Sequence, residues 1–292
     1  MNSQLNHKER YEMEKLVEQK RNMYNLGMGP LGDGILQLTE HLNINVIFLP
    51  KDPKTDDNPL SAIYLASKEK GNQNLFFIGV NSAQHYDSQL FSIAHELYHH
   101  FEDTDNVHLC QRMECAGSKR EHRANQFAAS FLLPDKSLKE EIYIKNNYDL
   151  NMDNWELPAS LRFIAKLHLD YKLPYKAIVH RLVEVGAIKD EIVFQALWSQ
   201  SARNETSVYY KIAMSFDQDL FMLLNKQTHK VGANARLLDY MLQNFESSGV
   251  EIDELAEDLS LFGKTIGEFG LADENDSGME DLMRKLKEED EG

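Results

Sequence analysis

The spacing of apolar positions changes along the chain and predicts helices first, then strands. Residues 3–26 are polar and charged with an intermittent apolar face, which predicts a helix, and a short helix is expected over 35–42. Short apolar runs at 45–49, 60–66 and 74–80 are separated by segments rich in turn-forming residues. These runs predict three strands, the last two paired as a β-hairpin.

The chain from Pro134 onward has helical periodicity throughout. Its clearest stripe has apolar residues at spacings of three and four, and core packing is the expected reason; it comprises Tyr209, Ile212, Ala213, Phe216, Leu220, Leu223 and Leu224. Two further helices are expected near 234–246 and 251–263. The segment after residue 271 is acidic and almost free of aromatic residues, which predicts disorder.

These elements predict an α+β fold in which a small mixed or antiparallel sheet packs on helices, followed by an all-helical C-terminal region. We expect a catalytic domain over 1–190, with its core at about 30–135 and a helical extension at 136–190. A helical region of unknown role at 191–271 and the acidic tail at 272–292 complete the predicted organisation.

Composition narrows the possible functions. The chain has 31 Lys and Arg against 47 Asp and Glu, a formal charge of −16, which disfavours direct binding to nucleic acid. No apolar run is long enough for a membrane helix, and the N-terminal segment lacks a signal-peptide pattern, so we expect a cytoplasmic protein without a membrane partner. Cys110 and Cys115 are expected to be reduced thiols in an ordinary loop, although their spacing and nearby His108 leave a second zinc site as an alternative.

One glycine motif is rejected as a nucleotide site. Residues 27–32 match G-x-G-x-x-G, but a helix is predicted before them where a dinucleotide site needs a strand, and a proline lies inside the motif. A glycine-rich break between two helices is the favoured interpretation.

Residues 95–99 carry the chemistry, because they form the motif H-E-x-x-H. On an α-helix, His95 and His99 lie one turn apart on the same face, where two imidazoles reach one metal ion. Apolar residues nearby form a stripe on another face, so the helix can bury one side and turn the histidines toward a cleft. Glu96 is then placed to act as general base toward a water on the metal.

A catalytic zinc site needs a third protein ligand, and the sequence offers several. Glu102 is too far along the same helix, and the metzincin ligand pattern is absent. Residues 119–133 predict the next helix, and Glu121 on it is the best candidate, with Asn125 one turn further as a residue that would orient a ligand. His108 and His122 are the competing ligands, and both are also candidates for a second oxyanion donor.

Four segments in this order resemble the ImmA/IrrE family of metallopeptidases. They are an apolar segment ending in Asn81, the sequence FSIAHELYHH at 91–100, the pattern E-x-x-A-N-x-F-A-A-x-F-L-L-P from Glu121 to Pro134, and a helical stretch at 164–188. The resemblance covers roughly residues 30–190. It implies His95, His99 and Glu121 as zinc ligands and Glu96 as the catalytic base.

The resemblance also implies a substrate class. Members of the family are typically intracellular regulators that cleave helix-turn-helix repressors and thereby switch on genes of mobile elements or stress responses. This chain departs from the pattern because it has no evident N-terminal DNA-binding domain and has about 100 additional C-terminal residues.

Two other functions remain open from the residues alone. The chain is expected to be a zinc endopeptidase, but it could instead be a metal-containing regulatory module that binds and sequesters a partner protein, or an amidohydrolase that acts on a small molecule. The ligand set also suits Mn, Fe or Co. The cleavage site, the activating signal and the oligomeric state have no sequence signal.

Overall fold

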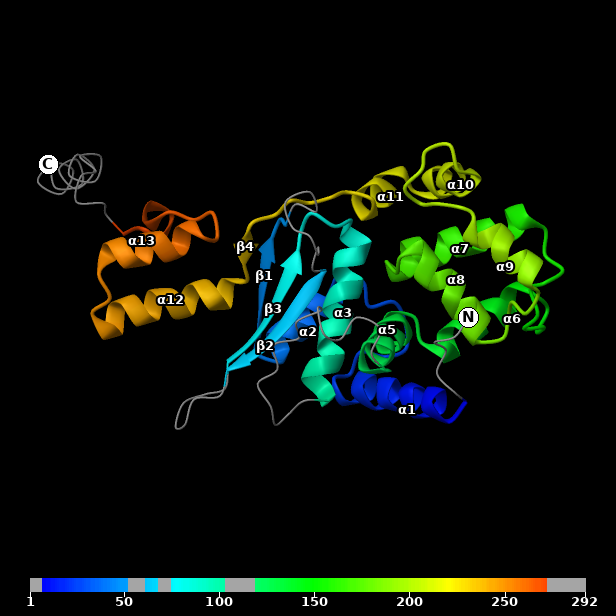
Figure 1. Ribbon diagram of the computed structural model, residues 1–292, viewed down its shortest axis with the longest axis horizontal. Coiled ribbons are helices and arrows are strands. Elements are labelled where there is room, and N and C mark those ends of the chain that lie inside the picture. The colour runs from blue at the N-terminus through cyan, green and yellow to red at the C-terminus, as the bar shows by residue number, and fades with distance from the viewer. Residues whose placement is uncertain (1–6, 52–60, 68–74, 103–118, 272–292) are drawn as a thin grey trace, which may run out of the picture. The chain divides into compact units, whose positions relative to one another are not determined.

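The computed structural model describes residues 7–51, 61–67, 75–102 and 119–271 (Figure 1). The chain divides into two compact units, Met1–Lys230 and Val231–Gly292. The predicted boundary near residue 190 falls within the first of these units, where α10 (Val208–Phe216) packs against α7 (Leu157–Tyr171). His108, Cys110, Cys115 and the acidic tail lie outside the described residues.

The described elements of the first unit are α1 His7–Met23, α2 Gly34–His41, β1 Ile44–Leu49, β2 Ala62–Ser67, β3 Leu75–Asn81, α3 Tyr86–Glu102, α5 Lys119–Leu132, α6 Asp135–Lys145, α7 Leu157–Tyr171, α8 Tyr175–Glu184, α9 Glu191–Trp198, α10 Val208–Phe216 and α11 Gln218–Leu224. Those of the second unit are β4 Gly232–Ala233, α12 Ala235–Ser248, α13 Ile252–Ser260 and the 3₁₀ turn η1 Ile266–Phe269. The predicted α+β fold class is confirmed, and apart from the two-residue β4 the described part of the predicted C-terminal region is helical.

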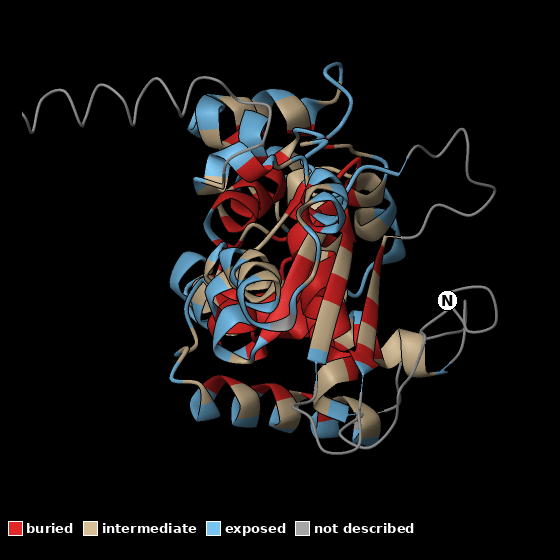
Figure 2. Cartoon of the chain, turned by 90° about the vertical axis from the view of Figure 1, so that its left-hand side faces the viewer, coloured by how far each residue is buried: buried red, intermediate tan, exposed pale blue. Residues whose placement is uncertain are grey.

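The strands of the first unit form a mixed sheet in the order β2-β3-β1. Strands β2 and β3 pair antiparallel, as the hairpin prediction requires, with Tyr64 opposite Ile78. Strand β1 pairs parallel with β3, with Val46 also opposite Ile78. Buried residues gather on the strands and on the helix faces turned toward them (Figure 2).

Helix α3 lies between the sheet and α5, which explains its amphipathic sequence (Figure 1). Its apolar stripe is fully buried, at Leu90, Ile93, Ala94 and Leu97. On α5 the small side chains of Ala124 and Ala128 are also fully buried, which lets the two helix backbones approach closely. The two helices that carry the predicted site are thus packed against each other along their length.

The glycine-rich segment after α1 is a break between two helices, as predicted. Gly27 and Gly32 both have positive φ, of 62° and 52°, a conformation that glycine adopts without strain. The fully buried guanidinium of Arg21 donates hydrogen bonds to the carbonyl oxygens of Gly27, Gly29 and Phe131. This cation therefore ties the segment to the end of α5.

The stripe at 209–224 is not a single buried face, so the core-packing expectation is wrong for part of it. Asp217 adopts an extended conformation that ends α10, and its carboxylate caps α11 by accepting from the Leu220 backbone N–H. The break changes the direction of the chain, so the helical spacing does not continue across it. Phe216 is 50% and Leu223 43% exposed, whereas Tyr209, Ala213 and Leu224 are fully buried.

The second unit has a small core of its own. Helices α12 and α13 confirm the helices predicted near 234–246 and 251–263, and Leu255, Leu259 and Ile266 are buried between them and η1. Among the described residues of the chain, no helix combines the length and apolarity needed to cross a membrane.

Candidate metal centre

Helices α3 and α5 bring the three predicted ligands together. His95 and His99 occupy successive turns of α3, with ring centroids 5.2 Å apart. Glu121, in the first turn of α5, places Oε2 3.0 Å from His95 Nε2 and Oε1 3.4 Å from His99 Nε2. One ligand atom from each residue lies within 4.8 Å of the other two.

These separations suit a shared divalent ion. Zinc binds nitrogen and oxygen ligands at about 2.0–2.2 Å with tetrahedral geometry, which puts neighbouring ligand atoms roughly 3.3–3.6 Å apart. Two imidazole nitrogens and a carboxylate are a typical ligand set of catalytic zinc, and they also accept manganese, iron or cobalt. The residues present therefore fit a divalent metal ion, with coordination positions left for water or substrate.

Charges at the cluster favour a cation. Hydrogen bonds from His95 and His99 hold the pKa of the Glu121 carboxyl well below its usual range. Burial disfavours the charged form of His95, yet its pKa is raised because Glu121 accepts its hydrogen bond and the Glu96 carboxylate lies nearby. A proton thus takes the place between these groups that a metal ion would take, and metal binding must displace it.

Asn125 holds the His95 ring in the orientation that ligation requires. Its Oδ1 accepts a hydrogen bond from His95 Nδ1 at 2.9 Å. An imidazole that donates from Nδ1 keeps the lone pair of Nε2 for a metal. The predicted place of Asn125, one turn beyond Glu121 on the same face of α5, matches this contact.

His95 and Glu121 of the cluster line a cavity of about 660 Å³, and Glu96, only 5% exposed, lies on its wall next to His95. Ser88 and Ser92, which are earlier on α3, continue the same wall. The cavity is large enough for several residues of a peptide. A carboxylate at this position can exchange a proton with a water held between the cluster and a substrate.

Two predicted candidates are placed differently. His122 lines a neighbouring cavity and not this one, and His108 lies outside the described residues. The rest of the lining includes residues that were not among the predicted site residues, namely Asn81, His85, Pro174 and Ala177. Asn81, Pro174 and Ala177 belong to two segments that carry the family resemblance, but only the fold shows that these segments meet at the cavity.

The site lies within a recognised family domain. Residues 39–183 match the peptidase M78 model, described as the IrrE N-terminal-like domain. Among solved structures, a Mycobacterium tuberculosis transcriptional regulator is similar, with 18% sequence identity and a TM-score of 0.32 over 60% of this chain and 46% of that one. The chain thus spans less than half the length of that regulator. No curated protein matches.

Proposed function

Because residues 39–183 belong to the IrrE N-terminal-like peptidase family, we propose that this chain is a zinc-dependent endopeptidase. His95, His99 and Glu121 are the proposed ligands, and Glu96 is the proposed general base. The observation that carries the proposal is the convergence of the three ligand atoms within 4.8 Å, beside a cavity that is lined by His95, Glu121 and Glu96.

Each residue of the site has a separate role in the proposed amide hydrolysis. A bound divalent ion supplies Lewis-acid polarisation of the scissile carbonyl and acidifies water. Glu96 accepts the proton of the attacking water and delivers it to the leaving nitrogen. Asn125 fixes the ring of His95. The burial of Glu96 limits competing water and strengthens its interactions with reacting groups.

The proposed substrate is a helix-turn-helix repressor in the cytoplasm, cut so that mobile-element or stress genes are expressed. This part of the proposal is supported by the family resemblance of the motifs around Glu96 and Glu121. A helix-turn-helix repressor from a gene that neighbours this one would be the first substrate to test. The alternative, a regulatory module that sequesters its partner without cutting it, is supported by the helices beyond residue 190.

Incubation of the purified protein with that repressor tests the proposal. Mass spectrometry should show discrete fragments with zinc and none with a chelator. The Glu96→Gln variant should keep the metal, measured by elemental analysis, and yield no fragments. Binding of the intact repressor without fragments, by a wild-type protein shown to contain metal, would establish the sequestering module instead.

A further inference from the structure

A second cavity, of about 830 Å³, adjoins the one that contains the metal-ligand cluster. The two cavities share three lining residues, Phe91 of α3, Asn125 of α5 and Ala177 of α8. Since Asn125 is also the hydrogen-bond partner of His95, the boundary between the cavities lies at the metal centre. The proposed hydrolysis itself uses no residue that lines the second cavity alone.

Residues from successive turns of α5 and α8 line this second cavity, so the cavity extends along both helices. The α5 residues are His122, Asn125, Gln126 and Ala129, and the α8 residues are Lys176, Ala177, His180, Val183 and Glu184. Most of these positions recur at spacings of three and four, so each helix presents one face to the cavity. Ala129 follows the ligand Glu121 by eight residues, which corresponds to about 12 Å along the axis of α5.

The first cavity follows α3 from the ligands toward the start of that helix. Ser88 precedes His95 by seven residues, or about 10 Å along α3. An extended peptide advances about 3.3 Å per residue. The part of the first cavity along α3 therefore accommodates about three residues of an extended chain.

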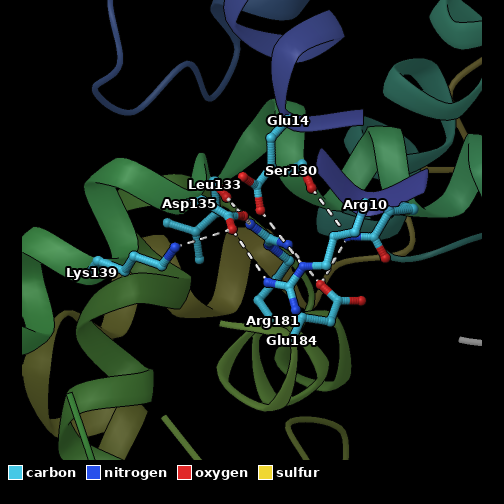
Figure 3. Close-up of polar contacts among 9 residues, drawn as sticks. Arg10, Glu14, Ser130, Leu133, Asp135, Lys139, Arg181 and Glu184 are labelled. Carbon is cyan, nitrogen blue, oxygen red and sulfur yellow. Dashed lines mark hydrogen bonds and ion pairs between the residues drawn. The ribbon is translucent and has the colours of Figure 1, made fainter. Parts of the chain in front are cut away.

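The charged groups of the second cavity are largely engaged by the protein itself. Glu184 accepts hydrogen bonds from Arg181 Nη1 at 2.6 Å and from Gln126 Nε2 at 3.0 Å. Arg10 donates to Asp135 Oδ2 at 3.3 Å, within the polar network of Figure 3. These side chains therefore contribute little net charge toward a ligand.

The other ionic side chains of this cavity, except Lys189, also form hydrogen bonds within the protein. Asp190 caps α9 by accepting from the Ile192 backbone N–H, and Glu191 accepts from Gln195. Lys176 donates to the Trp198 carbonyl oxygen, while Lys189 is exposed to solvent. The rest of the lining consists of five polar side chains, His122, Asn125, Gln126, His180 and Gln195, and an apolar wall formed by Phe91, Ala129, Ala177, Val183, Ile188 and Phe194.

The wall of the first cavity has a different chemistry. Away from the cluster it carries mainly short hydroxyl and amide side chains, namely Ser61, Asn81, Gln84, Ser88, Ser92 and Gln227. Among the described residues that line it, Lys51 is the only lysine or arginine. A polypeptide that passes from one cavity to the other thus meets mainly short polar side chains in the first and the apolar wall in the second.

We propose that the second cavity is the specificity subsite of this peptidase and binds a large aliphatic or aromatic side chain of the substrate polypeptide. The neighbouring residues of the same segment, small or neutral and polar, lie in the first cavity. Ala177 determines specificity because its small side chain leaves the passage between the cavities open. The inference rests on the proposed function in placing the scissile bond at the metal centre.

Peptide selection without hydrolysis tests the subsite. Full-length protein carrying Glu96→Gln is loaded with zinc, immobilised and exposed to a randomised decapeptide library, and the retained peptides are sequenced by mass spectrometry. We expect enrichment of peptides with a large apolar residue at one fixed register. Adding Ala177→Phe should lower that enrichment roughly tenfold or more, which corresponds to losing the burial of one aliphatic side chain.

Two further variants separate the subsite from general damage. Phe194→Asp, which places a carboxylate on the apolar wall, should abolish the same preference by a different route. Ala235→Phe, at an exposed position of α12 outside both cavities, should leave it unchanged. Thermal denaturation establishes that each variant is folded.

The outcomes are distinct from those that test hydrolysis. Retention of no peptides, retention without an apolar preference, or a preference that persists in both Ala177→Phe and Phe194→Asp would each overturn the subsite. If wild-type protein loaded with zinc leaves the selected peptides intact, the proposed peptidase activity fails while the subsite stands.

Discussion

Replacing Asn125 by alanine should weaken metal binding without weakening the fold. The side chain is exposed, and its described hydrogen bond is the one from His95 Nδ1 at 2.9 Å. Removing the group that orients a ligating imidazole typically reduces metal affinity by about 10- to 100-fold, or roughly 1.4–2.7 kcal/mol. The hydrogen bond contributes that much because it selects both the tautomer and the ring orientation of His95.

A competition titration with a chromogenic chelator measures the effect. Asn125→Ala should show a zinc dissociation constant raised by that factor, with an unchanged midpoint of urea denaturation in the metal-free state. Asn125→Asp should bind zinc at least as tightly as the wild type, because a carboxylate accepts the same hydrogen bond more strongly. Asn22→Ala, at an exposed position of α1, is the matched control.

The reasoning fails if Asn125→Ala binds zinc as tightly as wild-type protein. Equal losses in Asn125→Ala and Asn125→Asp would also refute it, since the hydrogen bond would then not be the cause.

Three further predictions concern the ligand set and the buried charges. Zinc at 100 times its dissociation constant should stabilise the wild type by about 2.7 kcal/mol, measured as a raised thermal midpoint, and Glu121→Gln should abolish most of that shift. Arg181→Met should destabilise the fold by about 3–5 kcal/mol in urea, because Asp135 and Glu184 lose their fully buried partner; a loss below 1 kcal/mol would contradict this. Burial and a hydrogen bond with Asp135 raise the pKa of Glu14 to about 7, so the folded state binds this proton more tightly than the unfolded chain. Its contribution to stability is then greatest below about pH 4.5 and is lost as the pH rises toward 7; urea denaturation at pH 5 and 8 should show a smaller decrease for Glu14→Gln than for wild type.

Local spacing was enough to predict the parts of the site that lie on one element. His95, Glu96 and His99 are fixed relative to one another by the geometry of a single helix, so their sequence spacing predicts their arrangement. The hairpin of β2 and β3 and most helix positions followed from apolar periodicity in the same way. Glu121 was selected by the need for a third ligand, and α5 places it against both imidazoles.

Other features depend on contacts between distant segments, which no local pattern encodes. The stripe at 209–224 has helical spacing, but Asp217 interrupts it and leaves Phe216 exposed. Ala177 and Asn125 meet at one boundary only because α8 packs against α5. The sequence around Arg181 predicts only a helix. In the structure this side chain is fully buried against carboxylates of α6 and α8.

The sequence by itself thus determined the reactive groups and their positions along each helix, since those depend on backbone geometry over a few residues. Tertiary structure alone decided which wall faces the metal centre, where the second cavity lies and which charges neutralise one another. These properties arise from packing among elements far apart in the chain, where the contact surface depends on the shapes of all the side chains between them.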